Sequence, residues 1–275
     1  MIRQREQPPE HDLGLAYDLR TLSRRRALTL FAGVGLATLV GCAPDEDAPA
    51  TGSTAAPSTP TGSATSANCE EIPEETTGPY PGDGSNGPNV LTESGIVRSD
   101  IRSSFGSSSG TADGVPLTVT LSLLDQANGC AALSGAAVYL WHCDREGRYS
   151  LYSDGGTDQN YLRGVQEADA DGQVTFTTIF PACYSGRWPH IHFEVYPSLA
   201  EATSAGNVMA TSQLALPEDV CDLVYATDGY EQSVDNKART SLDSDMVFSD
   251  GVDQQLADVN GDVGSGFTAT LALAV

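Results

Sequence analysis

Apolar and polar residues alternate in several segments of this chain, and the alternation predicts β-strands. Side chains of a strand point to its two faces in turn, so one buried face requires an apolar residue at every second position. Residues 117–123, 174–177 and 267–273 follow this period, and residues 136–141 and 190–196 form further strand-like segments. Turn-forming Asp-Gly and Asn-Gly pairs lie between them, and helical periodicity is weak. The pattern predicts an all-β fold, an antiparallel β-sandwich with long loops and little helix.

The first 41 residues have the layout of an export signal. A basic group, Ser23-Arg24-Arg25-Arg26, precedes the apolar run of residues 27–40, which is the order found in signal peptides. The paired arginines resemble the twin-arginine signal. Cys42 follows Leu39-Val40-Gly41, which resembles a lipobox. We therefore predict that Cys42 is lipidated and becomes the mature N-terminus; a soluble signal peptide with an incidental cysteine is the alternative.

The rest of the chain divides by composition into two parts. Residues 42–68 are mostly Ala, Ser, Thr, Pro and Gly, which cannot fill a core and predict a flexible tether. Residues 69–275 are enough for one domain. We expect an exported protein, lipid-anchored at the cell surface or secreted, and a homodimer is compatible with the sequence.

The net charge excludes one class of partner. The chain has 14 Lys and Arg against 37 Asp and Glu, a formal net charge of −23. Phosphate backbones repel a protein of this charge, so we expect no nucleic-acid binding. No apolar run reaches the roughly 20 residues of a membrane-spanning helix, so we expect membrane contact only through a lipid on Cys42.

Five cysteines follow Cys42, and export permits disulfides among them. The odd number leaves at least one thiol unpaired within a monomer. Cys143 ends a predicted core strand, so we expect it to be the buried free thiol. The other four allow three pairings, of which we favour Cys183–Cys221 with Cys69–Cys130.

Two of the three histidines after the signal lie in the motif His190-Ile191-His192. On a strand, both imidazoles point to one face with Cα atoms about 6.5–7 Å apart, close enough to share a metal ion. The alternative is one histidine in the core and one on the surface. Neither a Cys-x-x-Cys motif nor a third nearby histidine offers further ligands, but Tyr149 and Tyr184 do. Phenolate is a hard, anionic donor that suits Fe(III).

A set of short segments in this order resembles a known family. The segments are Trp141-His142-Cys143-Asp144, Gly147-Arg148-Tyr149-Ser150, Leu162-Arg163-Gly164, Asp169-Ala170-Asp171-Gly172, Thr178-Ile179-Phe180-Pro181-Ala182-Cys183-Tyr184 and Arg187-Trp188-Pro189-His190-Ile191-His192-Phe193. Together they resemble the iron core of the intradiol ring-cleavage dioxygenases, the family of catechol and protocatechuate dioxygenases. Thr77-Gly78-Pro79-Tyr80 resembles another segment of that family, and the likeness covers residues 70–220. It identifies residues 69–275 as an intradiol dioxygenase-like catalytic β-sandwich.

The resemblance implies a cofactor and its ligands. A non-haem Fe(III) ion would be held by Tyr149, Tyr184, His190 and His192. Tyr184 and His192 would form the axial pair, with Tyr149 and His190 equatorial beside a hydroxide. Tyr152 and Tyr161 are the alternatives to Tyr149.

The resemblance also implies the reaction. A catechol-type substrate would displace Tyr184 and the hydroxide, which accept its protons. Both atoms of O2 would then be inserted between the two hydroxylated carbons, to give a diacid of the cis,cis-muconate type. Arg187 matches an arginine near the reacting ring, and Gln213 matches a glutamine behind the ligands. Ordinary roles compete: Arg187 as a surface cation, and Gln213 as a strand residue facing solvent.

Two departures from the family bear on the substrate. Tyr184 and His190 are only six residues apart, where catechol and protocatechuate enzymes usually carry a longer loop, so we expect an open site that admits a bulky catechol. The basic residues that could hold a substrate carboxylate are Arg163, Arg145 and Arg148, and none is clearly placed to do so; protocatechuate is not favoured.

Two other functions compete with the dioxygenase. One is a non-catalytic transthyretin-like module that binds a metal or ligand at the surface. The other is a cupin-type metalloenzyme that uses His190, His192 and a carboxylate such as Glu194.

Overall fold

The computed structural model of the protein describes residues 69–275. The predicted signal (residues 1–41), the tether (42–68) and Cys42 lie outside the described residues. Within residues 69–275, no helix has the length and apolar character needed to cross a bilayer.

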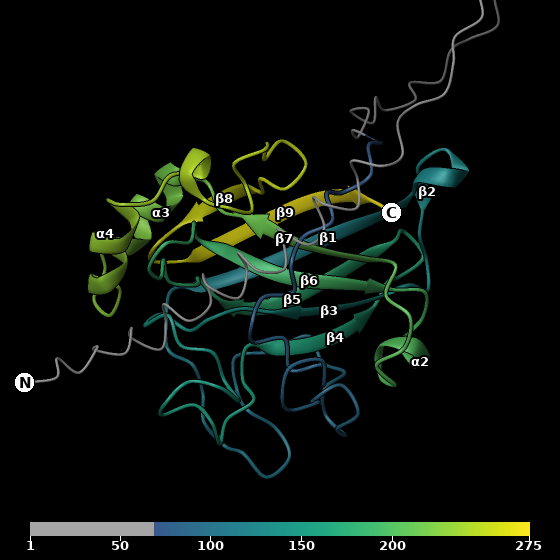
Figure 1. Cartoon of the computed structure of the whole chain (residues 1–275), viewed down its shortest axis with the longest axis horizontal. Coiled ribbons are helices and arrows are strands. Elements are labelled where there is room, and N and C mark those ends of the chain that lie inside the picture. The colour runs from purple at the N-terminus through teal and green to yellow at the C-terminus, as the bar shows by residue number, and fades with distance from the viewer. Residues whose placement is uncertain (1–68) are drawn as a thin grey trace, which may run out of the picture.

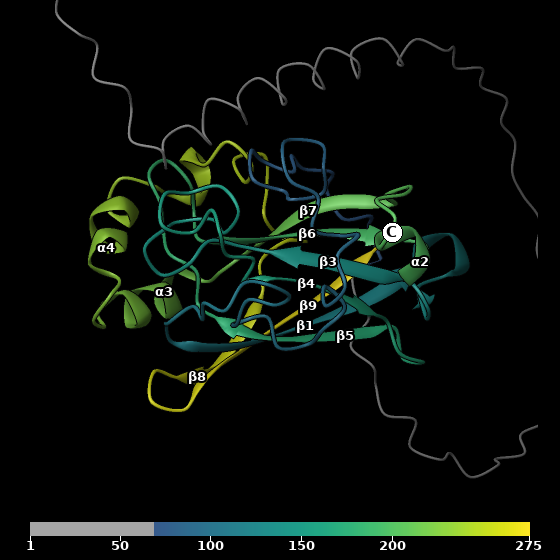
Figure 2. The ribbon, with the colours of Figure 1, turned by 90° about the horizontal axis from the view of Figure 1, so that it is seen from below.

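In the described part of the chain, nine strands form two sheets that pack face to face. The five-stranded sheet contains β1 (Pro116–Asp125), β2 (Ala131–Ala132), β5 (Gln173–Ile179), β8 (Asp258–Asp262) and β9 (Gly266–Ala274). The four-stranded sheet has the order β4 (Arg163–Glu167), β3 (Ala137–Trp141), β6 (His190–Tyr196) and β7 (Ala210–Ala215). The helical segments are η2 (Gln126–Asn128), α2 (Leu199–Ala202), α3 (Glu218–Tyr225), α4 (Glu231–Lys237) and η3 (Leu242–Ser244). Figure 1 labels the strands and the α-helices, and Figure 2 shows the sheets as two layers, with α3 and α4 at one end and α2 at the other. The predicted all-β sandwich is confirmed.

The five-stranded sheet follows the alternation seen in the sequence. Leu117, Val119, Leu121 and Leu123 of β1 are buried between the sheets, while the residues between them are more exposed. β5 pairs with β1 in the expected antiparallel direction, but β9 runs parallel to β1. The sandwich is therefore not wholly antiparallel. Alternation shows which face of a strand is buried, and it does not show the direction of the neighbouring strand.

The four-stranded sheet is covered on both faces. On its inner face, Val138 and Ile191 belong to the core between the sheets. On its outer face, Tyr139 and Trp141 pack with Leu91 and other residues of the loops that precede β1. Figure 2 shows these blue loops over β6 and β7. All seven residues of β6, its polar side chains included, are consequently buried.

Among residues 69–275 there is one disulfide, between Cys69 and Cys130, whose Cα atoms are 5.9 Å apart. Cys143 is a buried free thiol, as predicted. Cys183 and Cys221 are also free and buried, so the predicted Cys183–Cys221 bridge is not formed. Each of these two thiols is directed at a main-chain carbonyl instead, Cys183 at Arg187 O (3.3 Å) and Cys221 at Leu216 O (3.9 Å).

Candidate metal centre

The two histidines of β6 lie side by side on the outer face of their sheet. Their Nε2 atoms are 3.1 Å apart, and each residue is 2% exposed. His190 Nδ1 lies 2.5 Å from Trp188 O. A carbonyl oxygen only accepts, so Nδ1 of His190 carries the proton and its Nε2 presents a lone pair. This lone pair accepts a hydrogen bond from the Tyr184 hydroxyl at 3.1 Å.

Tyr184 reaches the histidines from the short connection between β5 and β6. Arg187 N donates to Tyr184 O at 3.2 Å, and Gly186 has a φ of 78° within this tight turn. The neighbouring loop approaches closely, because a Cβ on Gly147 would lie 3.2 Å from the Cβ of Tyr184. Gly147 also has a positive φ of 83°, which favours glycine at that position.

Tyr149 completes the group from the loop after β3. Asp144 organises that loop, because its Oδ1 accepts from Glu146 N and from Arg148 N. The Tyr149 ring centroid lies 6.0 Å from that of Tyr184 and 6.1 Å from that of His192. Its hydroxyl is buried and has no hydrogen-bond partner among residues 69–275. Such an orphaned polar atom is unusual in a folded protein.

The two alternative tyrosines have other partners. Tyr152 Oη donates to Asn86 O and accepts from Gly82 N, both at 2.8 Å. Tyr161 Oη donates to Asp144 Oδ2 at 3.4 Å. The structure therefore gathers Tyr149 with Tyr184, His190 and His192, and it places Tyr152 and Tyr161 elsewhere.

Trp141 fixes the plane of the second imidazole. The two rings stack with their centroids 5.0 Å apart and an interplanar angle of 6°, because Trp141 of β3 and His192 of β6 are direct partners across the strands. The sequence motif contains Trp141, but its role as a platform for His192 required knowledge of the strand register.

Arg187 lies behind the ligand group and is fully buried. Its Nη2 donates to Gln213 Oε1 at 2.6 Å, and its Nε donates to Asp245 Oδ2 at 3.0 Å. Gln213 in turn donates to Thr76 O at 2.9 Å. Arg187 is thus not a surface cation, and Gln213 does not face solvent. Nothing in the sequence indicated that Asp245 pairs with Arg187. The two residues are 58 positions apart, and Asp245 lies in a loop after η3.

Burial determines the protonation of these groups. It lowers the pKa values of His190 and His192 well below the usual range, and the Arg187 charge adds to this effect. Both imidazoles are therefore neutral, which is the form that binds metals. Burial also raises the pKa of Tyr149 well above its usual value, with a further contribution from Tyr184. Without a cation the phenol keeps its proton.

The group is closed off from solvent. Tyr184 is its most exposed member at 5%, contrary to the open site expected from the short connection to His190. The reason is that the loop with the Thr-Gly-Pro-Tyr motif covers it. The ring of Tyr80 from this motif lies 4.9 Å from the ring of Tyr149.

Comparison with known proteins shows which family this chain resembles. A family model described as Dioxygenase matches residues 87–219. An intradiol ring-cleavage dioxygenase from Tetranychus urticae has a similar structure, with 29% identity, a TM-score of 0.59 and coverage of 75% of this chain and 94% of that chain. The chain is therefore similar to the intradiol ring-cleavage dioxygenases. The dioxygenase domain of a dioxygenase–carbohydrate-binding protein fusion from Streptomyces sp. SirexAA-E is also similar, with 25% identity, a TM-score of 0.47 and coverage of 75% of this chain and 98% of that chain.

The ligand group fits the ferric ion that the similarity to intradiol dioxygenases implies. Two neutral imidazole nitrogens and two phenol oxygens are gathered in a buried layer, and the Tyr149 hydroxyl has no other partner there. The carboxylate of the cupin-type alternative is occupied, because Glu194 accepts from Tyr196 Oη at 2.7 Å. No cluster of three or more His, Cys, Asp or Glu side chains suited to a metal occurs within the described chain.

Proposed function

We propose that the protein is a non-haem Fe(III) intradiol dioxygenase that inserts both atoms of O2 into a catechol-type ring and forms a cis,cis-muconate-type diacid. The observation that carries this proposal is the meeting of His190 Nε2, His192 Nε2 and the Tyr184 hydroxyl within hydrogen-bond distance, beside the unpartnered Tyr149 hydroxyl. When bound by these four residues, Fe(III) would act as a Lewis acid and as a template for catecholate and O2.

Tyr184 is the proton acceptor in this proposal. It is held by a turn at the end of a loop and not by a strand, so its side chain can move while β6 stays in place. Its phenolate oxygen would take the proton from a substrate hydroxyl as it moves aside. His190 is more firmly held, because its Nδ1 donates to Trp188 O. The stacked Trp141 holds the plane of His192 in the same way.

Arg187 stabilises negative charge on the substrate ring in this proposal. Asp245 and Gln213 bind its guanidinium from two sides, so the charge is oriented before the substrate arrives. A donor that is already oriented needs no reorganisation during the reaction, and in a water-excluded site its effect is large.

The substrate is a catechol without a ring carboxylate. All three arginines that could have held a carboxylate have other partners. Arg163 is 1% exposed and donates to Ser150 Oγ and to Pro81 O. Arg148 pairs with Asp144 at 3.0 Å, and Arg145 pairs with Glu146 at 3.3 Å.

A spectrum of the purified protein tests the function. Phenolate bound to Fe(III) absorbs visible light by charge transfer, so we expect a red to burgundy protein with one iron per chain. Catechol should change the spectrum without oxygen, and air should then cause O2 uptake in a 1:1 ratio with catechol consumed. Stoichiometric iron without O2 uptake on any catechol would instead favour the non-catalytic binding module. Zinc in place of iron would exclude the dioxygenase.

The location of the protein, at the cell surface, is a separate part of the proposal. The basic group at Arg24-Arg25 and the apolar run before Cys42 support export and attachment to the cell surface through a lipid on Cys42. Cys42→Ser should release the protein from the membrane fraction or block its maturation. A mutant that stays membrane-bound, with a mature N-terminus well beyond residue 42, would contradict the lipid anchor.

A further inference from the structure

The segment that leads to Tyr184 has no regular secondary structure, yet side chains from α3 and α4 and the loop between them bind its main chain. Tyr230 Oη donates to Phe180 O at 2.8 Å, and Tyr225 Oη donates to Pro181 O at 3.1 Å. Both tyrosines are buried. The carbonyl groups of this segment are therefore paired with protein donors that come from 44 and 50 residues further along the chain.

Helix α4 binds both the N–H and the C=O of Cys183, the residue directly before Tyr184. Cys183 N donates to Ser233 Oγ at 3.0 Å, and Asn236 Nδ2 donates to Cys183 O at 2.9 Å. Ser233 and Asn236 are three residues apart and so lie on the same face of the helix. Ser233 is fully buried. One face of α4 thus fixes both polar main-chain groups of Cys183, the residue directly before Tyr184.

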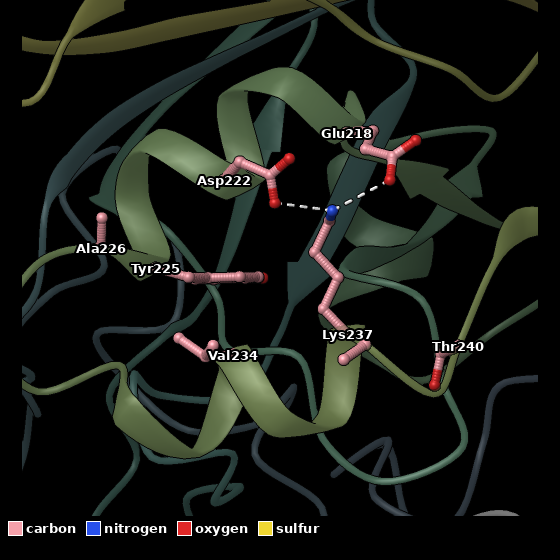
Figure 3. Close-up of a pocket in the computed structure, with 8 residues that line it drawn as sticks. Glu218, Asp222, Tyr225, Ala226, Val234, Lys237 and Thr240 are labelled. Carbon is pink, nitrogen blue, oxygen red and sulfur yellow. Dashed lines mark hydrogen bonds and ion pairs between the residues drawn. The ribbon is translucent and has the colours of Figure 1, made fainter.

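Helix α4 is also attached to helix α3 by ion pairs. Lys237 Nζ lies 3.0 Å from Glu218 Oε1 and 2.7 Å from Asp222 Oδ1 of α3. Figure 3 shows these ion pairs across a pocket of about 570 Å³, with the Tyr225 ring between the two helices. These ion pairs join α4, which binds Cys183, to α3. Helix α4 also lies beyond residue 219, where the match to the family model ends.

We propose that Ser233 and Asn236 are positioning residues for Tyr184: by holding the Cys183 peptide, they orient the phenol toward the histidines and define where it returns after it has moved aside. This inference rests on the proposed function, in which Tyr184 is the ligand that leaves and accepts a proton. It adds two residues outside the metal group.

Geometry explains why such a support is needed. The connection from Tyr184 to His190 is short, so strand β6 restrains the main chain on that side. On the other side, the bonds from Ser233 and Asn236 restrain the peptide groups next to Tyr184. A rotation there would carry the phenol oxygen along, because the oxygen lies at the far end of a long side chain, and a misplacement of about 1 Å is enough to lose roughly 100-fold in rate.

Hydrogen exchange of the iron-free protein tests the support itself. In Ser233→Ala the Cys183 amide loses its acceptor, and we expect about fivefold faster exchange in peptides covering residues 180–187, since one hydrogen bond contributes about 1 kcal/mol. Asp235→Ala is the matched control, because Asp235 is an exposed residue of the same helix and should leave exchange unchanged. Equal exchange in wild type, Ser233→Ala and the control would overturn the proposal.

The iron-loaded proteins test the consequence for Tyr184. In Ser233→Ala and Asn236→Ala we expect unchanged iron content, a shift of the charge-transfer band and Raman modes that disappear in Tyr184→Phe, and about tenfold slower catecholate binding. Asp235→Ala should match wild type. Faster exchange with an unchanged band and an unchanged binding rate would show that the peptide is held without positioning Tyr184, and would overturn the inference alone. A wild-type protein with no colour after iron loading would overturn the proposed function, and the role toward Tyr184 with it.

Discussion

Arg187 and Asp245 form a fully buried ion pair, with the guanidinium Nε 3.0 Å from the carboxylate Oδ2 and both side chains 0% exposed. The same Oδ2 accepts from Trp188 N at 2.6 Å, and Oδ1 accepts from Val247 N at 2.8 Å. One carboxylate therefore joins the arginine, the main chain before His190 and the loop after η3. The C-terminal part of the sandwich is in this way connected to the candidate metal centre.

Substitution of Asp245 should weaken both stability and catalysis. Asp245→Asn leaves the Arg187 charge buried without its counter-charge, which costs about 3–5 kcal/mol when a buried pair is broken. We expect a loss of free energy of unfolding of roughly this size in urea denaturation, and a kcat at least about tenfold lower with iron retained. Asp243→Asn, at an exposed position of η3, is the control and should change neither. An Asp245→Asn enzyme with wild-type kcat would show that the ion pair serves folding alone.

The four candidate ligands should differ in their effect on iron. Tyr149→Phe, His190→Ala and His192→Ala should each lower the iron content measured per chain, because each removes a donor that the structure gathers at one point. Tyr184→Phe should be the mildest for iron content, since this tyrosine is the ligand that leaves, but it should slow catecholate binding because a proton acceptor is lost. Full iron retention in the double mutant without both histidines would refute the ligand set.

Three arginines that already have partners predict which catechols are cleaved. A ring carboxylate that enters the buried site would have no free cation to meet, since Arg163, Arg148 and Arg145 have other partners, and burying an unpaired charge is costly. We therefore expect a kcat/KM for catechol at least about 100-fold above that for protocatechuate, a difference of about 3 kcal/mol. Comparable values for the two substrates would mean that one of these arginines changes partner.

Local patterns in the sequence predicted five strands, and the structure confirms them as β1, β3, β5, β6 and β9. Strand β4 was missed because its buried Arg163 interrupts the apolar pattern, and β7 because its buried Ser212 and Gln213 look like loop residues. Both strands lie at positions where hydrogen bonds from distant loops satisfy polar side chains. Such partners are not visible in a local pattern.

The candidate site was likewise predicted from the sequence only in part. The period of a strand was enough to place His190 beside His192, and the family resemblance supplied Tyr149 and Tyr184. Asp245 and Ser233 were not found, because each acts on a segment about 50 or more residues away. The Cys183–Cys221 disulfide was predicted from the number of cysteines alone. It is not formed, because the buried Cys183 thiol lies against the main-chain carbonyl of Arg187.

The cysteines give a chemical test of the structure. Peptide mass spectrometry without reduction should find one bridge, Cys69–Cys130, and alkylation should reach Cys143, Cys183 and Cys221 only after denaturation, because these three are buried. The bridge links residues 61 apart, so replacing both its cysteines by alanine should lower the free energy of unfolding by about 4 kcal/mol. Detection of a Cys183–Cys221 bridge would contradict the structure.

Glu75 should make stability fall as the pH rises. Burial raises the pKa of this carboxyl from 4.5 to about 8, with a smaller contribution from Asp250, while Gln255 donates a hydrogen bond to it at 3.4 Å. Between these two pH values the folded protein keeps the proton that the unfolded chain has lost, so the free energy of unfolding decreases with pH through this window. At about 1.4 kcal/mol per pKa unit, the total effect is up to roughly 5 kcal/mol.

Glu75→Gln removes this titration while keeping an amide of the same shape. The unfolding free energy of wild type minus that of Glu75→Gln, measured by urea denaturation from pH 5 to pH 8, should therefore fall steadily. The subtraction cancels other titrations, such as that of His142, whose pKa burial lowers to about 4 and which acts in the opposite direction at acidic pH. Parallel curves for the two proteins would show that Glu75 is ionised in the folded state across this range. In that case, the carboxylate must be stabilised by Arg187, whose charge already acts to lower its pKa.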